Sequence, residues 1–297
     1  MESRWRIATN FRAASTDIHG IIASDAACHS MVGRVACLLQ TLPFFAPPVT
    51  STMSADSPRF PHDASASTPA YCRQAALRAW RAGLTDINGP PGLFRAAWAI
   101  ALHELPDADL AAGEKTVEQL ADTVRSRIRS QHVDAVLAHL HDVLFELAGF
   151  AGNRDEYYAP ANSYLPEVLR TKRGLPISLT LLYQRVAHQC GVTVHGVNAP
   201  GHFMAEVETG DGRSMYVDPF FGGGVLTKAE ALARIEQATG RPAAHMTEPL
   251  ARATPVQWLA RMLTNLSASF AMASRDRDVL AMQELLAELA ASSRARR

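Results

Sequence analysis

The stretch from Arg173 to Phe220 constrains the fold of this chain more than any other part of its sequence. Its first half is an apolar run that Pro176 opens and Gly191 closes. Proline is favoured at the first position of a helix and glycine just past its end, so this run predicts a helix over residues 176–190. The second half predicts strands at residues 192–198, 203–208 and 214–219, the last two joined by a glycine-containing hairpin turn.

Helices are predicted on both sides of this segment, which indicates an α+β fold. Apolar residues recur at helical steps before it, and the capping-box pair Thr227 and Glu230 begins a helix after it. The predicted helices are residues 72–82, 92–103, 114–129, 132–148, 227–238, 254–273 and 278–290. Residues 149–173 form a loop-rich stretch, and a long loop inside a compact domain often lines a site.

This pattern divides the chain into four regions. Residues 1–70 end in a stretch of Pro, Ser, Thr and Ala with no apolar period, and we expect them to form a low-complexity, disordered tail. Residues 71–148 form an N-terminal helical region and residues 149–250 the core. Residues 251–297 form a C-terminal helical hairpin with one apolar face on each helix.

Charge and apolar runs argue against two classes of partner. The 297 residues carry 29 Lys and Arg against 29 Asp and Glu, so the chain lacks the basic footprint of nucleic-acid binding. The apolar run at residues 35–46 is interrupted by polar residues and a proline and is too short to span a bilayer, so we expect no membrane contact. Four scattered cysteines without a Cys-x-x-Cys pair fit a reducing cytoplasm, and no motif indicates a metal or another cofactor.

His202 and Asp218 are the candidate catalytic residues. Sixteen residues separate them, so on the two hairpin strands they share one sheet face, opposite or diagonal to each other. The carboxylate could then fix one imidazole nitrogen and leave the other free as a base. The alternative is structural, since His202 follows a Pro-Gly bend and Asp218 begins an Asp-Pro-Phe turn at a strand end.

Three runs carry a resemblance to a known family: NRDEYYAPANSYLPEVLRTKRGLPISLTLLY, GVNAPGHF and VDPFFGGGVLT, which occur in this order. Together they resemble the SirB-type branch of the transglutaminase-like superfamily, bacterial proteins often followed by tetratricopeptide-like helices. The resemblance spans about Phe94 to Leu289 and is strongest from Asn153 to Leu226. It implies a papain-like core, in which one helix packs on an antiparallel sheet, and a tetratricopeptide-like C-terminal hairpin.

The resemblance also implies a Cys-His-Asp triad, with His202 and Asp218 in the last two places. Counting back from Gly191 puts the cysteine position at Pro176, so the chain departs from the triad at its nucleophile. Ser178 is a weak substitute, because it points about 200° away around the helix axis. Its other interpretation is a first-turn residue that satisfies free backbone amides.

The loop before this helix holds further candidates for the walls of a cleft. Asn162, Ser163 and Tyr158 match the family pattern, and Arg173 and Pro176 lie at the helix start. The same polar residues are also common turn formers, and tyrosines are common anchors of a loop, so a structural role stays open.

Two functional hypotheses follow. The first is a non-catalytic transglutaminase-like protein, a pseudoenzyme that acts through a protein partner in interaction or regulation. The second is a cryptic hydrolase or acyltransferase on peptide or amide bonds, with His202 as base, Asp218 as its orienting residue, and water or Ser178 as the attacking group.

Overall fold

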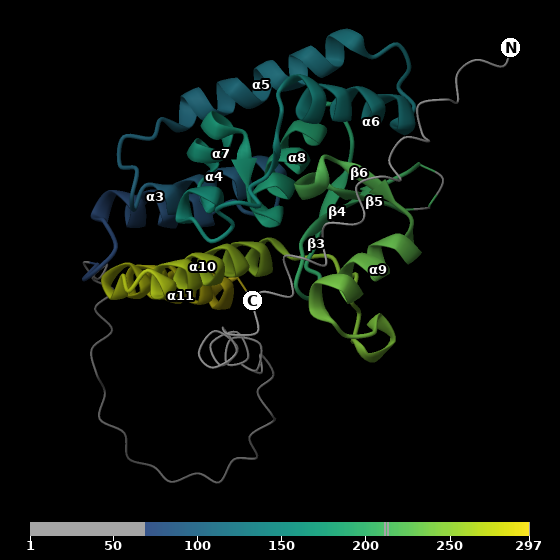
Figure 1. The fold of residues 1–297 in the computed structure, drawn as a ribbon. Coiled ribbons are helices and arrows are strands. Elements are labelled where there is room, and N and C mark those ends of the chain that lie inside the picture. Colours follow the sequence, from purple (N-terminus) through teal and green to yellow (C-terminus); the bar gives the residue numbers. More distant parts are fainter. Residues whose placement is uncertain (1–68, 211, 213, 297) are drawn as a thin grey trace, which may run out of the picture. The chain divides into compact units, whose positions relative to one another are not determined.

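The computed structural model describes residues 69–210, 212 and 214–296, which form an α+β fold (Figure 1). The expected tail at residues 1–70 lies outside the described residues, apart from its last two positions. The N-terminal helices are α3 (Gln74–Leu84), α4 (Pro90–Ala101), α5 (Leu110–Arg127) and α6 (Val133–His141). No helix in this described part of the chain is both long and apolar enough to cross a bilayer.

Helix α8 (Pro176–Gln189) is the centre of the fold. Every residue from Pro176 to Ala187 is buried, because the N-terminal helices, the sheet and α10 (Pro255–Met272) all pack around it. A helix enclosed on all sides needs apolar residues around its whole circumference, which explains its weak amphipathic pattern. Its buried polar side chains are Ser178, Thr180, Gln184 and Arg185.

An antiparallel sheet of four strands packs against α8. Its order is β3 (Val194–Val197), β4 (Met204–Glu208), β5 (Ser214–Asp218) and β6 (Gly224–Leu226), so each strand pairs with the next along the chain. A separate parallel pair, β1 (Ala151–Gly152) with β2 (Arg173–Gly174), brings the loop-rich stretch to the start of α8.

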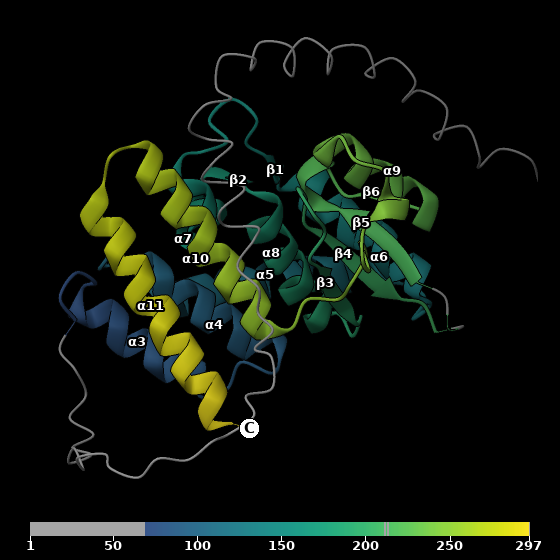
Figure 2. The same cartoon turned by 90° about the horizontal axis from the view of Figure 1, so that it is seen from below.

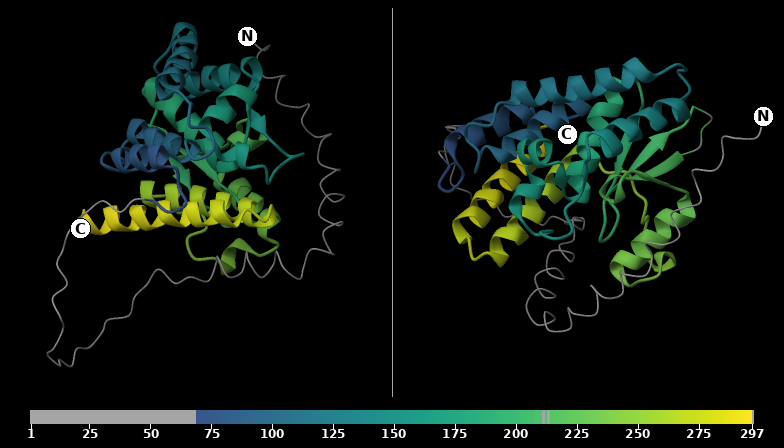
Figure 3. Two further views of the ribbon diagram at one scale, coloured as in Figure 1. Left: turned by 90° about the vertical axis from the view of Figure 1, so that its left-hand side faces the viewer. Right: turned by 45° about the horizontal axis from the view of Figure 1, so that its top comes forward.

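The sheet has two covered faces. Ala205 and Val217 belong to the main core, which also contains α8. Met204 and Tyr216 alternate with them and join a smaller apolar cluster with Ile235 of helix α9 (Lys228–Thr239). Side chains of successive strand residues point to opposite faces, so α8 and α9 lie on opposite sides of this sheet. Figures 1 and 3 show α9 beyond the strands, away from the N-terminal helices.

The C-terminal helices α10 and α11 (Asp276–Ala295) form an antiparallel hairpin that lies beside α3 and α4 (Figure 2). The indole of Trp80 donates a hydrogen bond to the carbonyl of Leu285 at 3.1 Å, and Arg81 forms an ion pair with Glu288. The apolar faces predicted for this hairpin therefore enter the main core, where Leu263 and Leu285 are fully buried. Its tetratricopeptide-like character stays a prediction.

Most predicted elements are confirmed, with three differences. The helix expected at residues 132–148 ends as an α-helix at His141 and continues as a π-helix over Asp142–Leu147. The stretch expected to be loop-rich contains the short helix α7 (Leu165–Thr171), which Pro166 helps to begin. Strands β1, β2 and β6 were not predicted, because two or three residues show no alternation.

Candidate functional site

His202 and Asp218 form a buried, hydrogen-bonded pair. The imidazole Nε2 lies 2.9 Å from the Asp218 Oδ2, and the exposed fractions of the two residues are 7% and 0%. In the register of β4 and β5, Ala205 lies opposite Val217. Continued by one residue, this register sets Asp218 opposite Met204, so His202, two residues before β4, is its diagonal neighbour, as the sequence predicted.

Backbone and side-chain contacts hold the carboxylate in place. Asp218 ends β5, and its Oδ1 accepts a hydrogen bond from the backbone N–H of Phe220 at 3.2 Å. From α9, the guanidinium of Arg234 lies 3.9 Å from Oδ2. Because Asp218 is fully buried, these contacts and His202 replace the water that the carboxylate would otherwise need.

The contacts of the imidazole leave one nitrogen available. Nε2 faces the carboxylate, whereas no hydrogen bond joins Nδ1 to any described residue. The rings of Phe220 and Phe221 lie 6.4 and 6.0 Å from the imidazole centre, so the ring is bounded by aromatic surface. A histidine oriented in this way could accept a proton at Nδ1 if a nucleophile stood beside it.

The start of α8 presents no such nucleophile. Pro176 is the first helical residue, and the hydroxyl of Ser178 is committed to local hydrogen bonds. Ser178 Oγ accepts from the backbone N–H of Leu175 at 3.0 Å and donates to the carbonyl of Asn162 at 2.7 Å. With an exposed fraction of 0%, this serine fits the role of a first-turn residue that satisfies a free amide.

Asn162 links the preceding loop to α8. Its side-chain amide donates to the carbonyls of Glu156 and Tyr157, and its Oδ1 accepts from Asn153. Its backbone carbonyl accepts from both Leu175 N–H and Ser178 Oγ. These contacts pin the loop against the helix start.

The other predicted cleft residues are spread over this region. Ser163 is buried, and its hydroxyl has no hydrogen-bond partner among the described residues. Tyr158 is 58% exposed and stacks edge-on against Tyr157. Arg173 donates to the carbonyls of Gly149 and Lys172, so its guanidinium stabilises the chain next to β1 and β2.

Neither cysteine of the described chain lies at the start of α8. Cys190 follows the last residue of α8, at the opposite end of the helix from Pro176, and burial raises the pKa of its thiol. Cys72 precedes α3, where burial raises the pKa of its thiol to about 11. A raised pKa leaves little reactive thiolate at neutral pH.

Comparison with known proteins assigns the chain to a family. A family model described as the transglutaminase-like superfamily matches residues 111–264. The chain belongs to this superfamily. That match contains the helix start, His202 and Asp218, so the superfamily core and the candidate site occupy the same part of the chain.

The chain is also similar to curated proteins. UPF0162 proteins from Xylella fastidiosa strains 9a5c and Temecula1 are 32% and 33% identical over 209 residues, which cover 68% of this chain and 73% of each relative. F-box only protein 21 from Mus musculus is 34% identical over 132 residues, covering 42% of this chain and 20% of that protein. No solved structure gives a significant match.

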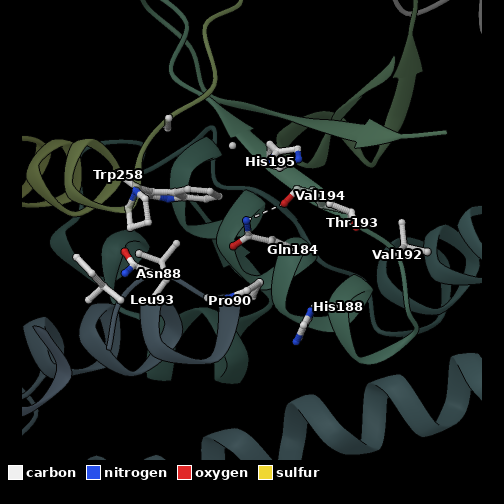
Figure 4. A pocket seen from close by; sticks show the side chains of 15 residues that line it. Asn88, Pro90, Leu93, Gln184, His188, Val192, Thr193, Val194, His195 and Trp258 are labelled. Atoms are coloured by element: carbon white, nitrogen blue, oxygen red, sulfur yellow. Dashed lines mark hydrogen bonds between the residues drawn. The ribbon is translucent and has the colours of Figure 1, made fainter. Parts of the chain in front are cut away.

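A cavity of about 250 Å³ opens near the other end of α8 (Figure 4). Gln184 and His188 of α8, the β3 edge, the loop before α4 and Trp258 of α10 contribute to its lining. The Gln184 amide donates to the carbonyl of Val194, which ties the helix to the edge strand. None of the predicted site residues lines this cavity, so it is a separate feature from the His202–Asp218 pair.

Two arginines that no sequence pattern indicated lie beside the pair. Arg234 comes from α9 and Arg154 from the loop after β1, and both guanidinium groups stack on Phe221. No spacing rule joins residues eighty positions apart in sequence, so no local signal could have placed them together.

Proposed function

We propose that this chain is a non-catalytic member of the transglutaminase-like superfamily, which binds a protein partner at the surface around His202 and Asp218. The observation that carries the proposal is the start of α8, where Pro176 stands and the Ser178 hydroxyl is already hydrogen-bonded on both sides. An imidazole base without a nucleophile beside it lacks the group that would form a covalent intermediate.

The intact pair has a structural use in such a protein. Asp218 joins β5 to the turn that follows, and His202 joins the start of β4 to that carboxylate. Exposed aromatic side chains lie next to this framework, including Tyr157 and Tyr158, whose exposed fractions are 37% and 58%. Exposed tyrosines are common anchors in protein interfaces, which favours a partner at this surface.

A hydrolase is the second candidate. In that case His202 activates a water molecule, or Ser178 after local rearrangement, and Asp218 orients the imidazole. The 2.9 Å contact between Nε2 and Oδ2, which leaves Nδ1 available, favours this alternative. The substrate would be a peptide or an amide.

Chemical labelling tests the two proposals against each other. The purified full chain is treated with a fluorophosphonate and with an acyl-phosphate probe, and labelled residues are located by mass spectrometry. The non-catalytic proposal expects no labelling at the start of α8. Labelling at Ser178 that His202→Ala abolishes, with the melting temperature preserved, would overturn it.

The hydrolase has its own test. It predicts that His202→Ala and Asp218→Asn both reduce hydrolysis of peptide and anilide substrates. If both variants keep every activity that the parent chain shows, the pair has no catalytic role. Membership of the SirB-type branch and a cytoplasmic location are part of the same proposal, supported by the three sequence runs that resemble this branch and by the scattered cysteines.

A further inference from the structure

Two arginines meet on one aromatic ring at the edge of the candidate site. The Cζ of Arg154 lies 4.7 Å from the centre of the Phe221 ring, and the Cζ of Arg234 lies 4.2 Å from the same centre. The two guanidinium carbons can therefore be no further apart than the sum of these distances. Both side chains gain a cation–π contact, but their like charges repel each other.

These two positive charges exceed the negative charge available to them. Arg154 forms no ion pair with any described carboxylate, and Arg234 has Asp218 alone, at 3.9 Å. Asp218 already accepts hydrogen bonds from His202 and from the Phe220 backbone. The local balance therefore leaves at least one guanidinium without a counter-ion in the described chain.

Other charged groups nearby do not change this balance. Asp155 and Glu156 follow Arg154 in the chain, but neither forms an ion pair with Arg154 or Arg234 among the described residues. Glu230 precedes Arg234 by one turn of α9, and its carboxylate caps the helix at Thr227. Arg261 adds a further positive charge, whose hydrogen bonds go to neutral acceptors on Asn198 and Ala199.

A row of aromatic side chains leads from the two arginines, through the buried Phe220, to the exposed Tyr157 and Tyr158. The ring of Phe220 lies 5.2 Å from Phe221 and 5.8 Å from Tyr157, and Tyr157 lies 5.3 Å from Tyr158. Tyrosine and arginine are the residues most enriched at the energetic centres of protein interfaces. Arginine also matches a carboxylate with two parallel hydrogen bonds, which a lysine cannot do.

We infer that the protein segment bound at this site is acidic, with its carboxylates held by Arg154 and Arg234 and its backbone laid over Tyr157 and Tyr158. The inference rests on the proposed function, because it names the chemistry of the partner at the same site. A peptide fits better than a nucleic acid, because one or two arginines can hold a carboxylate, whereas a chain with 29 acidic and 29 basic side chains lacks the excess of basic charge that a phosphate backbone needs.

Peptide binding tests the inference. Fluorescein-labelled peptides of alternating glutamate and glycine, the same peptides with glutamine in place of glutamate, and oligothymidylate are titrated with the full chain at low salt. Fluorescence anisotropy should detect the glutamate peptide with an affinity at least about tenfold above that of the glutamine peptide. Added salt should weaken this binding, because exposed charge pairs are screened.

Three variants locate the binding. Arg154→Gln should weaken the glutamate peptide about tenfold, and the double variant with Arg234→Gln should abolish the difference between the two peptides. Arg277→Gln removes the same charge from an exposed position on α11 and should leave binding unchanged. Melting temperatures show whether each variant is folded. If the double variant unfolds, the single variant Arg154→Gln, at an exposed position, still tests the inference.

Four results would overturn the inference. They are no binding of the glutamate peptide at millimolar concentration, equal binding of the glutamine peptide, tighter binding of oligothymidylate, and an Arg154→Gln variant that binds like Arg277→Gln. Labelling of Ser178 by the fluorophosphonate or the acyl phosphate that His202→Ala abolishes would instead overturn the non-catalytic role. The two failures are therefore seen in different measurements.

Discussion

Replacing Ser178 by alanine separates a structural hydroxyl from a nucleophilic one. The hydroxyl accepts from Leu175 N–H at 3.0 Å and donates to the Asn162 carbonyl at 2.7 Å, inside a fully buried site. Each such bond contributes about 0.5–1.5 kcal/mol to stability. The Leu175 N–H keeps a second acceptor, the Asn162 carbonyl at 3.1 Å, so the variant leaves no orphaned amide.

The expected loss is therefore about 1–2 kcal/mol of unfolding free energy, since the better helix propensity of alanine offsets about 0.5 kcal/mol. For a domain of this size, that loss corresponds to a melting temperature lower by about 2–8 °C. Urea denaturation and thermal scanning of the purified full chain measure both quantities.

Ser267→Ala is the matched control. Its hydroxyl lies in α10, and the buried Oγ has no hydrogen-bond partner among the described residues. Removing it breaks no hydrogen bond and should not destabilise the protein. If Ser178→Ala is as neutral as Ser267→Ala, the hydrogen bonds at the helix start do not stabilise the fold, and the structural interpretation of Ser178 is refuted.

Three further predictions concern the surroundings of the site. Gly223→Ala should lower the unfolding free energy, measured by urea denaturation, by about 3 kcal/mol, because its φ of +73° disfavours a side chain and a Cβ would overlap Phe145. Gly222→Ala is the control: its φ is +72° but the space around it is open, so it should cost only about 1 kcal/mol. Asp218→Ala should lower the unfolding free energy in urea by about 3 kcal/mol, because it leaves the buried imidazole of His202 unpaired. The isosteric Asp218→Asn should lower it by about 1 kcal/mol, and equal losses in the two variants would show that the shape of the carboxylate is unimportant. Burial lowers the pKa of His141 from 6.5 to about 4, so as the pH falls below 6.5 the unfolded chain takes up a proton before the folded chain does. The unfolding free energy should therefore be highest above pH 6.5 and decline by about 3 kcal/mol by pH 4. The urea midpoints of His141→Gln should fall less over this range.

Local patterns anticipated most of the core. Proline and glycine at the two ends of α8 predicted its bounds, and counting residues along two strands of a hairpin predicted that His202 and Asp218 share one face as close neighbours. The π-helix after His141 was not predictable, because apolar residues continue at three- and four-residue steps through Leu147. Only the backbone hydrogen-bond pattern changes there, and the spacing of apolar residues in the sequence does not show such a change.

The contacts around the site could not be predicted from local patterns in the sequence. Asn162 and Ser178 were both candidates, but their pairing depends on how the loop after β1 returns to the helix start. Arg154 and Arg234 gave no signal, since an exposed loop arginine and an arginine on an amphipathic helix are ordinary surface residues.

Residue identity and local spacing were enough to establish that α8 begins with a proline, and hence that its first position carries no nucleophile. They were also enough to bring His202 and Asp218 to one face of a hairpin, because strand parity depends on counting alone. Packing between distant segments decided that the Ser178 hydroxyl donates a hydrogen bond to the Asn162 carbonyl. It also decided that Arg154 and Arg234 both stack on Phe221. Those contacts join segments whose separation in space depends on how the whole core packs, so no short stretch of sequence predicts them.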